Sequence, residues 1–321
     1  MEHAGDKVTI RRLAGQVIGL IFTLLLVSGF IFVATEVLPV DPATAALGQD
    51  ATPERVAALR SAMNLDQPGI NRYLEWVGGL VHGDLGSSLV SQVPVAQVVD
   101  DRLRNTLVLA VLALVIGTPI AWGLGVVAAL KPNRALDVAI SSSTLLMSAI
   151  PQFVVGSILV LVFAIILGWA PAVTTVPADA PVEALLSSCW LPVATLTVSW
   201  AAYLARTVRS AMIDSLASDH VRAARLAGLH DRDVLMRHAL PTAMPPAIAT
   251  SALYAGALIG GIVIVEAVFN YPGLGTLMVS AVQGGDLPMV QSIAMIGAVA
   301  WALVNLTADV LIAAVDPRTD A

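Results

Sequence analysis

Long apolar stretches without a charged residue dominate the chain, and shorter polar segments separate them. A helix needs roughly 20 apolar residues to cross the hydrocarbon core of a bilayer. Six stretches are long enough, namely 13–35, 105–130, 138–178, 184–205, 239–265 and 287–308. The pattern therefore predicts an all-α, polytopic membrane protein with six transmembrane helices in contact with the lipid bilayer.

Two apolar runs contain residues that interrupt a helix. The third run is interpreted as one long helix over about 137–168 that bends near Pro151, because a proline inside a helix removes a backbone donor. A seventh run, 267–285, contains the turn sequence Asn270-Tyr271-Pro272-Gly273. Loop backbone cannot face lipid, so this run is predicted to lie at the interface or against other helices rather than to span the membrane.

The composition agrees with a membrane protein. Hydrophobic residues make up 57% of the 321 residues and charged residues only 12%, whereas soluble domains carry about 25% charged residues. The net charge of −6 speaks against a nucleic-acid partner. The single cysteine, Cys189, excludes an internal disulfide and a cysteine-based metal cluster.

Lysine and arginine are distributed unevenly between the two sides of the predicted membrane. Six spans place both termini on one side, which carries Lys7, Arg11, Arg12, Lys131, Arg134, Arg206, Arg209, Arg222, Arg225, Arg232, Arg237 and Arg318. The other five arginines lie in the first external loop, 36–104. The positive-inside rule therefore predicts a multi-pass protein of the cytoplasmic membrane with both termini in the cytoplasm. The first span is predicted to be an uncleaved helix, since its loss would break the even number of spans.

The external loop, 36–104, is long enough to fold on the membrane surface. Thr52-Pro53 predicts the start of a short helix with Val56, Leu59 and Met63 on one face. A second helix is predicted after Pro68, with an apolar face formed by Ile70, Tyr73, Leu74, Val77 and Val81. The loop is either a cap that shields the outer helix ends or a docking surface for an extracellular partner.

The polar segment 214–241 predicts two short helices on the cytoplasmic side. Asp219 is expected to cap the first, and Gly228 to end it in a left-handed conformation. Asp231 is expected to cap the second, which runs to Pro241. Such a pair forms either a compact knob that another protein can approach closely or an ordinary basic loop that anchors the topology.

Several kinds of site are missing from the sequence. The two lysines follow Asp6 and Leu130, so no Gly-Lys phosphate-binding loop exists, and no His-Glu-x-x-His zinc motif occurs. The apolar spans carry no ionisable residue of the kind that ion-coupled carriers use, although broken helices can also hold sodium through carbonyl groups. We therefore expect a protein that is not an enzyme, binds no metal or cofactor itself, and is driven by another subunit.

Residues 222–241 carry a recognisable motif. The segment Arg222-Ala223-Ala224-Arg225-Leu226-Ala227-Gly228, followed after nine residues by His238-Ala239-Leu240-Pro241, resembles the EAA loop of binding-protein-dependent ABC importer permeases. Arginine at the glutamate position is similar to the peptide/nickel branch of that family. Other stretches resemble its B-type permease in the same order: Leu38-Pro39-Val40-Asp41-Pro42, Gly83-Asp84-Leu85-Gly86, Arg102 with Asn105-Thr106-Leu107, Ala149-Ile150-Pro151-Gln152-Phe153, Val265-Glu266-Ala267-Val268-Phe269, Asn270-Tyr271-Pro272-Gly273-Leu274-Gly275 and Asp316-Pro317-Arg318.

The resemblance implies partners and a mechanism. It implies a second, C-type permease subunit, two cytoplasmic ATPase subunits that hold the ATP and Mg, and an extracytoplasmic substrate-binding protein. The loop would be the coupling helix, with contacts to the ATPase from Asp219, Arg222, Ala223, Ala224, Arg225, Gly228, Leu240 and Pro241. ATP would then drive alternating access for peptides. The same branch handles glutathione, nickel chelates and some oligosaccharides, so the exact ligand stays open.

Polar and amphipathic residues within the spans are candidates for lining a translocation path: Ser148, Gln152, Ser199, Trp200, Tyr203, Ser251, Tyr254 and Glu266. Small polar residues are also ordinary packing residues in membranes, so both interpretations stay open. Glu266 is expected to orient the proline-glycine turn or a peptide amine. An ion-driven carrier acting alone, or a scaffold or receptor without transport, remains an alternative.

The predicted organisation of the chain has four parts. They are 1–35, a cytoplasmic N-terminus with the first span; 36–104, the external helical loop; 105–315, a transport core of five spans that includes the coupling loop 214–241; and 316–321, a cytoplasmic tail.

Overall fold

The computed structural model describes residues 2–36, 42–47, 51–62 and 65–315. Helices form nearly all of this part, and one isolated bridge between Ser87 and Pro94 is the extended pairing within it. The predicted tail 316–321 and Met63 lie outside the described residues. The chain divides into two compact units, Met1–Leu103 with Thr276–Ala302 and Arg104–Gly275 with Leu303–Ala321, which are described separately.

The first unit contains the first predicted span and the external loop. Its helices are α1 (Glu2–Glu36), α2 (Pro42–Leu47), α3 (Pro53–Ala62) and α4 (Gly69–Val81), with the start of α5 (Val95–Leu130), most of α13 (Leu274–Gln283) and the start of α14 (Leu287–Val315). Along α1 the large apolar side chains are exposed, Phe22 and Phe30 among them, as expected of a helix that faces lipid.

The two predicted helices of the external loop are confirmed. Helix α3 begins at Pro53, and the Arg55 amide donates to the Thr52 hydroxyl at 3.4 Å. Helix α4 begins after Pro68 and packs its aromatic residues, not the whole predicted apolar face, on α1. Tyr73 stacks edge-on against Phe32 at 5.5 Å between ring centroids. Ile70, Leu74 and Val81, which belong to the predicted face, remain exposed.

The second unit is built around a long central helix. It contains the rest of α5, then α6 (Ala135–Ala149), α7 (Gln152–Leu159), the π-helical segment η2 (Val160–Ile166), α8 (Val182–Ser188), α9 (Trp190–Ala217), α10 (Asp219–Leu226), α11 (Asp231–Asp233), the π-helical segment η3 (Val234–Ala239) and α12 (Leu240–Phe269). Helix α9 is buried along most of its length and supplies much of the core. A Cβ at Gly125 of α5 would lie 2.7 Å from the Ala205 carbonyl of α9, so this glycine lets the two backbones approach closely.

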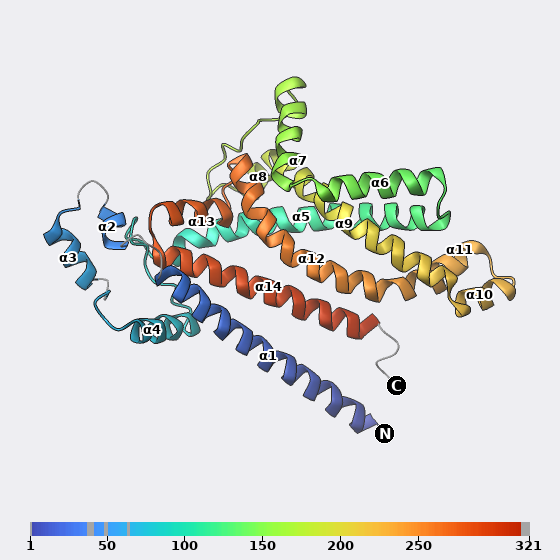
Figure 1. Cartoon of the computed structure of the whole chain (residues 1–321), viewed down its shortest axis with the longest axis horizontal. Helices are drawn as coiled ribbons and strands as arrows, with labels where there is room; N and C mark the ends of the chain where they lie inside the picture. Colours follow the sequence, from blue (N-terminus) through green and yellow to red (C-terminus); the bar gives the residue numbers. More distant parts are fainter. Residues whose placement is uncertain (1, 37–41, 48–50, 63–64, 316–321) are drawn as a thin grey trace. The chain divides into compact units, whose positions relative to one another are not determined.

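The structure is consistent with six spans and bends or breaks three of them, of which the fifth bends by 45° between Gly256 and Leu258. Among the described residues, three helices are long and apolar enough to cross a membrane, and the number rises to six if each bent pair forms one span. The predicted bend near Pro151 is a break of 104° between α6 and α7, so the expectation of one long, merely bent helix was wrong (Figure 1). The fourth span breaks by 67° after Ser188, and α9 then continues to Ala217 instead of ending near 205.

The seventh apolar run does not span the membrane, as predicted. Its helix, α13, has 10 residues, about half of what a bilayer requires. The turn before it begins with Asn270 in the left-handed conformation, with φ of 49°. This conformation ends α12 and reverses the chain at the predicted turn residues.

Candidate functional site

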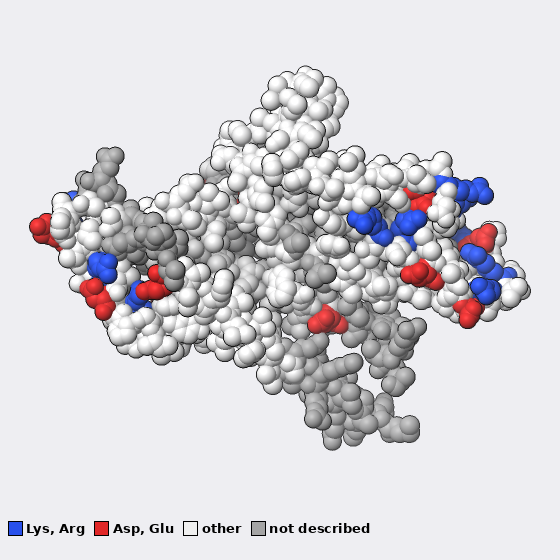
Figure 2. All heavy atoms as spheres, in the orientation of Figure 1, with Lys and Arg blue, Asp and Glu red and all other residues white. Residues whose placement is uncertain are grey.

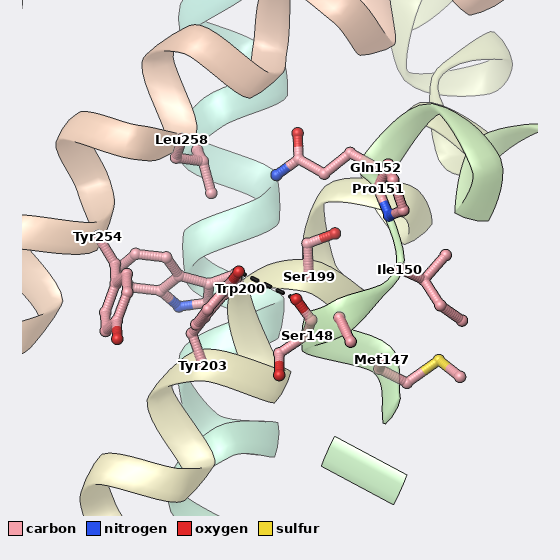
Figure 3. A pocket seen from close by; sticks show the side chains of 11 residues that line it. Met147, Ser148, Ile150, Pro151, Gln152, Ser199, Trp200, Tyr203, Tyr254 and Leu258 are labelled. Atoms are coloured by element: carbon pink, nitrogen blue, oxygen red, sulfur yellow. Dashed lines mark hydrogen bonds between the residues drawn. The ribbon is translucent and has the colours of Figure 1, made fainter. Parts of the chain in front are cut away.

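A cavity of about 410 Å³ lies where the break between α6 and α7 faces α9 and α12 (Figure 3). This cavity is lined by six of the eight residues that were predicted to line a translocation path: Ser148, Gln152, Ser199, Trp200, Tyr203 and Tyr254. The backbone break supplies the rest of the wall with Met147, Ala149, Ile150 and Pro151, and α12 adds Leu258. Sequence reasoning missed these apolar residues because only polar and amphipathic side chains were considered.

Two tyrosines from different helices form one wall of this cavity. The rings of Tyr203 on α9 and Tyr254 on α12 stack with centroids 4.7 Å apart and an interplanar angle of 28°. The Tyr203 hydroxyl donates to the Ser148 carbonyl at 3.0 Å, which is the dashed line in Figure 3. The stack therefore connects α9 and α12, and the hydrogen bond ties it to the end of α6.

Gln152 reaches across the cavity from the first turn of α7. Figure 3 shows its amide extended toward the α12 side, near Leu258. A Cβ at Gly261 of α12 would overlap the Gln152 Oε1 atom, so the glycine makes room for this amide. Among the described residues, Oε1 is buried without a hydrogen-bond partner. A buried acceptor without a partner is costly, which marks this amide as a polar group placed for more than packing.

Ser251 and Glu266 do not line the cavity. The Ser251 hydroxyl donates to the Ala247 carbonyl at 2.7 Å, which is the ordinary packing role of a serine in a helix. Glu266 is fully buried. It accepts from the Thr106 hydroxyl at 2.6 Å and from the Gly275 amide at 2.6 Å. These contacts favour the first of its two predicted roles, which is to orient the proline-glycine turn, and the buried carboxylate is not accessible to a peptide amine in this structure.

The turn after α12 is held by further buried groups that sequence reasoning did not assign a role. Asn105 is fully buried and donates to the carbonyls of Ala178 and Pro272 at 2.9 and 2.8 Å. The Tyr271 hydroxyl donates to the Asn105 carbonyl at 3.0 Å, and burial raises the pKa of this phenol. Both residues belong to stretches that resemble the permease family, and this resemblance was the only feature of the sequence that could have indicated their importance.

A second cavity, of about 520 Å³, lies further along α9 and is lined by Ser141, Leu145, Tyr203, Arg206, Thr207, Arg209, Ser210 and Tyr254. One of its arginines is neutralised. Arg209 forms a two-pronged ion pair with Asp137 of α6, with distances of 2.5 and 2.7 Å, and Asp137 also accepts from the Asn133 amide. Asp137 is almost completely buried, so this pair fixes the start of α6 against α9.

The segment predicted to be the coupling loop is a small knob with a buried face and an exposed face. On α10, Val221 and Ala224 are buried, whereas Arg222, Ala223 and Arg225 are exposed. Gly228 has φ of 79°, the left-handed conformation that was predicted. A Cβ at Gly228 would meet no atom within 4 Å, so the backbone conformation, and not crowding, requires glycine here.

The predicted caps of the two loop helices were placed one residue late. Ser218 occupies the N-cap position of α10 and Asp219 begins the helix, while His230 precedes α11 and Asp231 begins it. The second helix is also not separate, because α11 continues through η3 into α12. Leu240 and Pro241 are consequently the first residues of α12 and follow the π-helical segment η3 directly.

Charged side chains gather at the end of the second unit where α10 and α11 lie (Figure 2). The pair between Arg222 and Asp219 spans 3.7 Å with both side chains exposed, and the pair between Arg237 and Asp233 is similar. Exposed pairs contribute little to folding. The charged residues on the exposed face of α10 therefore contribute little to the folding stability of this chain.

Comparisons with known proteins point in one direction. The family described as binding-protein-dependent transport system inner membrane component matches residues 121–321, and the N-terminal part of such components matches 8–110. The glutathione transport system permease proteins GsiC of Escherichia coli (strain K12) and Shigella boydii serotype 4 (strain Sb227) are 36% identical over 304 residues, which is 94% of this chain and 96% of theirs. An inward-facing structure of the methionine ABC transporter MetNI covers 69% of this chain and 96% of its own, with a TM-score of 0.52 and 20% identity, a likeness of fold.

Proposed function

We propose that this chain, which belongs to the binding-protein-dependent transport system inner membrane components and is a permease of the peptide/nickel class of ABC importers, carries small peptides across the membrane. The observation that carries the proposal is the cavity beside the α6–α7 break, which combines a tyrosine stack, an indole and an amide. Aromatic faces and amide groups suit a peptide backbone with varied side chains.

The peptide class rests on the relatives together with the cavity. Permeases named for glutathione transport match 94% of this chain, and glutathione is a tripeptide. A cavity of about 410 Å³ lies within the usual range for small-molecule sites. Glutathione and short peptides are therefore the cargo to test first, ahead of the nickel chelates and oligosaccharides that related permeases handle.

In this proposal, partner ATPases bind α10 and supply the energy for transport. ATP and Mg bind to these partner subunits, and this chain contributes no catalytic group. The exposed Arg222 and Arg225 face the partner, and the small Ala223 permits close approach. A second permease completes the cavity, and an external binding protein delivers the peptide. Rigid-body motion of the knob passes into α12, because η3 joins the loop directly to that helix.

Orientation and the external loop belong to the same proposal. Both termini and the α10 knob face the cytoplasm, and the helices of 53–81 receive the binding protein. Deletion of 53–81 should then weaken crosslinking to the binding protein more than to the ATPases. Equal loss of both partners would show that the segment serves folding instead.

The test is reconstitution of the complete complex in liposomes. With ATP inside and binding protein outside, labelled glutathione or trialanine should accumulate, and removal of ATP or of the ATPase subunits should stop uptake. ATP-independent uptake by this chain alone would overturn the coupling mechanism and favour an ion-driven carrier. ATP-dependent uptake of a sugar or metal chelate, with no peptide uptake, would overturn the peptide assignment only.

A further inference from the structure

The two cavities of the second unit adjoin along α9 and are together called the trough. Tyr203 and Tyr254 line both of them, so the tyrosine stack stands where they meet. Four of the α9 residues that line the trough recur every three or four positions and so share one face of the helix: Ser199, Tyr203, Arg206 and Ser210. Trp200, Thr207 and Arg209 flank this row. Residues 199 to 210 cover roughly 16 Å at 1.5 Å per residue. An extended peptide of about four or five residues has that length.

One cation in this trough lacks a neutralising partner. Arg209 is paired with the buried Asp137, whereas Arg206 forms no ion pair within the part of the chain that the structure describes. Its guanidinium instead donates to the Ser148 hydroxyl at 3.3 Å. Arg206 lines the second cavity and Ser148 the first, so this arginine lies at the junction beside the tyrosine stack.

The place of Arg206 in the fold differs from that of a loop residue. Because α9 continues to Ala217, Arg206 lies inside a helix, about 24 Å from Trp190 along its axis. Its side chain is exposed and lines the second cavity, so its charge is accessible to a ligand there. Apart from Leu145 and the ion-paired Arg209, the other residues that line this cavity carry hydroxyl groups: Ser141, Tyr203, Thr207, Ser210 and Tyr254. A single guanidinium among hydroxyls matches one flat, singly charged carboxylate.

We propose that Arg206 is the carboxylate-recognition residue of the translocation trough, where it binds the C-terminal carboxylate of a short peptide. The peptide backbone then runs along α9 past the tyrosine stack, and the Gln152 amide pairs with it at the other end. The permease thereby prefers peptides with a free C-terminus, independently of the binding protein. This inference rests on the proposed peptide function.

The test compares two forms of one peptide in the complete reconstituted complex. Uptake of trialanine and of its C-terminal amide, and likewise of glutathione and its glycinamide form, is measured for the native chain and for Arg206→Gln, Arg206→Lys and Arg134→Gln. Discrimination by the binding protein is the same in every variant, so it cancels when the ratios of acid to amide uptake are compared. Arg134 is an exposed arginine that lines neither cavity.

The expected result is a selective loss of preference. Arg206→Gln should lower the ratio of acid to amide uptake by about tenfold, the usual size for a lost charge-assisted hydrogen bond. Arg206→Lys should restore part of it, and Arg134→Gln should change nothing. An unchanged ratio in Arg206→Gln, with peptide uptake intact, would overturn the inference and leave the proposed function standing. Failure of the native complex to import either peptide form with ATP would overturn the proposed function, and this inference with it.

Discussion

The two ends of α12 are built in opposite ways. At the Phe269 end, Glu266 is fully buried and its carboxylate binds Thr106 and Gly275 within the same chain. At the Leu240 end, α10 exposes Arg222 and Arg225, and its ion pairs are loose and solvated. Polar groups at the first end are satisfied internally and stabilise the fold. Those at the second end contribute little to the fold, which leaves them available to a partner.

The largest effect should follow from removing the buried carboxylate. Glu266→Leu leaves the Thr106 hydroxyl and the Gly275 amide without their acceptor, and each unsatisfied buried group costs about 1–3 kcal/mol. We expect little folded protein in detergent and no uptake. Thermal unfolding and size-exclusion chromatography measure this. The matched control is Glu183→Leu, at an exposed glutamate of α8, which should behave like the native chain. If Glu266→Leu is as stable as the native chain, the buried carboxylate does not stabilise the Phe269 end, and the proposed difference between the two ends is contradicted.

A substitution at Gly228 should separate folding from transport. Gly228→Trp forces a side chain into the left-handed backbone conformation, at a cost of about 1–2 kcal/mol, and places a bulky group on the knob. We expect the permease to insert and remain folded while uptake falls more than tenfold. Gly228→Asn is the matched control, because asparagine tolerates this conformation. Equal uptake by the tryptophan and asparagine variants would show that transport does not depend on the shape of the knob at Gly228.

The charge of α10 should matter less than its shape. Arg222→Glu is expected to lower peptide uptake and peptide-stimulated ATP hydrolysis by about tenfold, with unchanged thermal stability, since exposed pairs are worth at most about 1 kcal/mol. The double swap Asp219→Arg with Arg222→Glu restores the internal pair but not the charge shown to a partner. The swap should stay defective. If the double swap recovers native uptake, the role of Arg222 is to pair with Asp219 within the loop and not to contact a partner.

The smallest effect should come from Thr106. Its hydroxyl donates to Glu266 and accepts from the Leu274 amide at 2.8 Å. Thr106→Val keeps the shape and loses both bonds, so the unfolding free energy should fall by about 1–3 kcal/mol with modest loss of uptake. Thr106→Ser, which keeps the hydroxyl, should retain most of the stability. Equal stability of the two variants in a denaturation series would count against this network.

Much of the second unit could be predicted from local sequence. The apolar runs gave the spans, and proline placed the break at residue 151. Gly228 predicted the left-handed end of α10, because this backbone conformation favours glycine and can therefore be recognised from a single residue. The resemblance marked the Glu266 region, and side-chain polarity selected six of the cavity residues.

Features that depend on packing could not be predicted. The sharpness of the α6–α7 break, the extension of α9 through Arg206 and Arg209, and the π-helical junction η3 follow from contacts between distant residues. From the sequence alone, Arg209 is predicted to lie in a basic loop. In the fold, it pairs with Asp137 of α6. The sequence leaves both a ligand contact and a loop contact open for Glu266, and its burial and its two hydrogen bonds favour the loop contact.

The most direct test of the central claim, that α10 is the contact through which an ATPase drives this permease, is site-directed crosslinking. In a background where Cys189 is replaced by Ala, a cysteine at the exposed Ala223 is compared with one at the exposed Glu183. The account predicts a crosslink from position 223 to an ATPase subunit that changes in yield when ATP is added, and none from position 183. An intact complex in which position 223 forms no such crosslink would contradict the account.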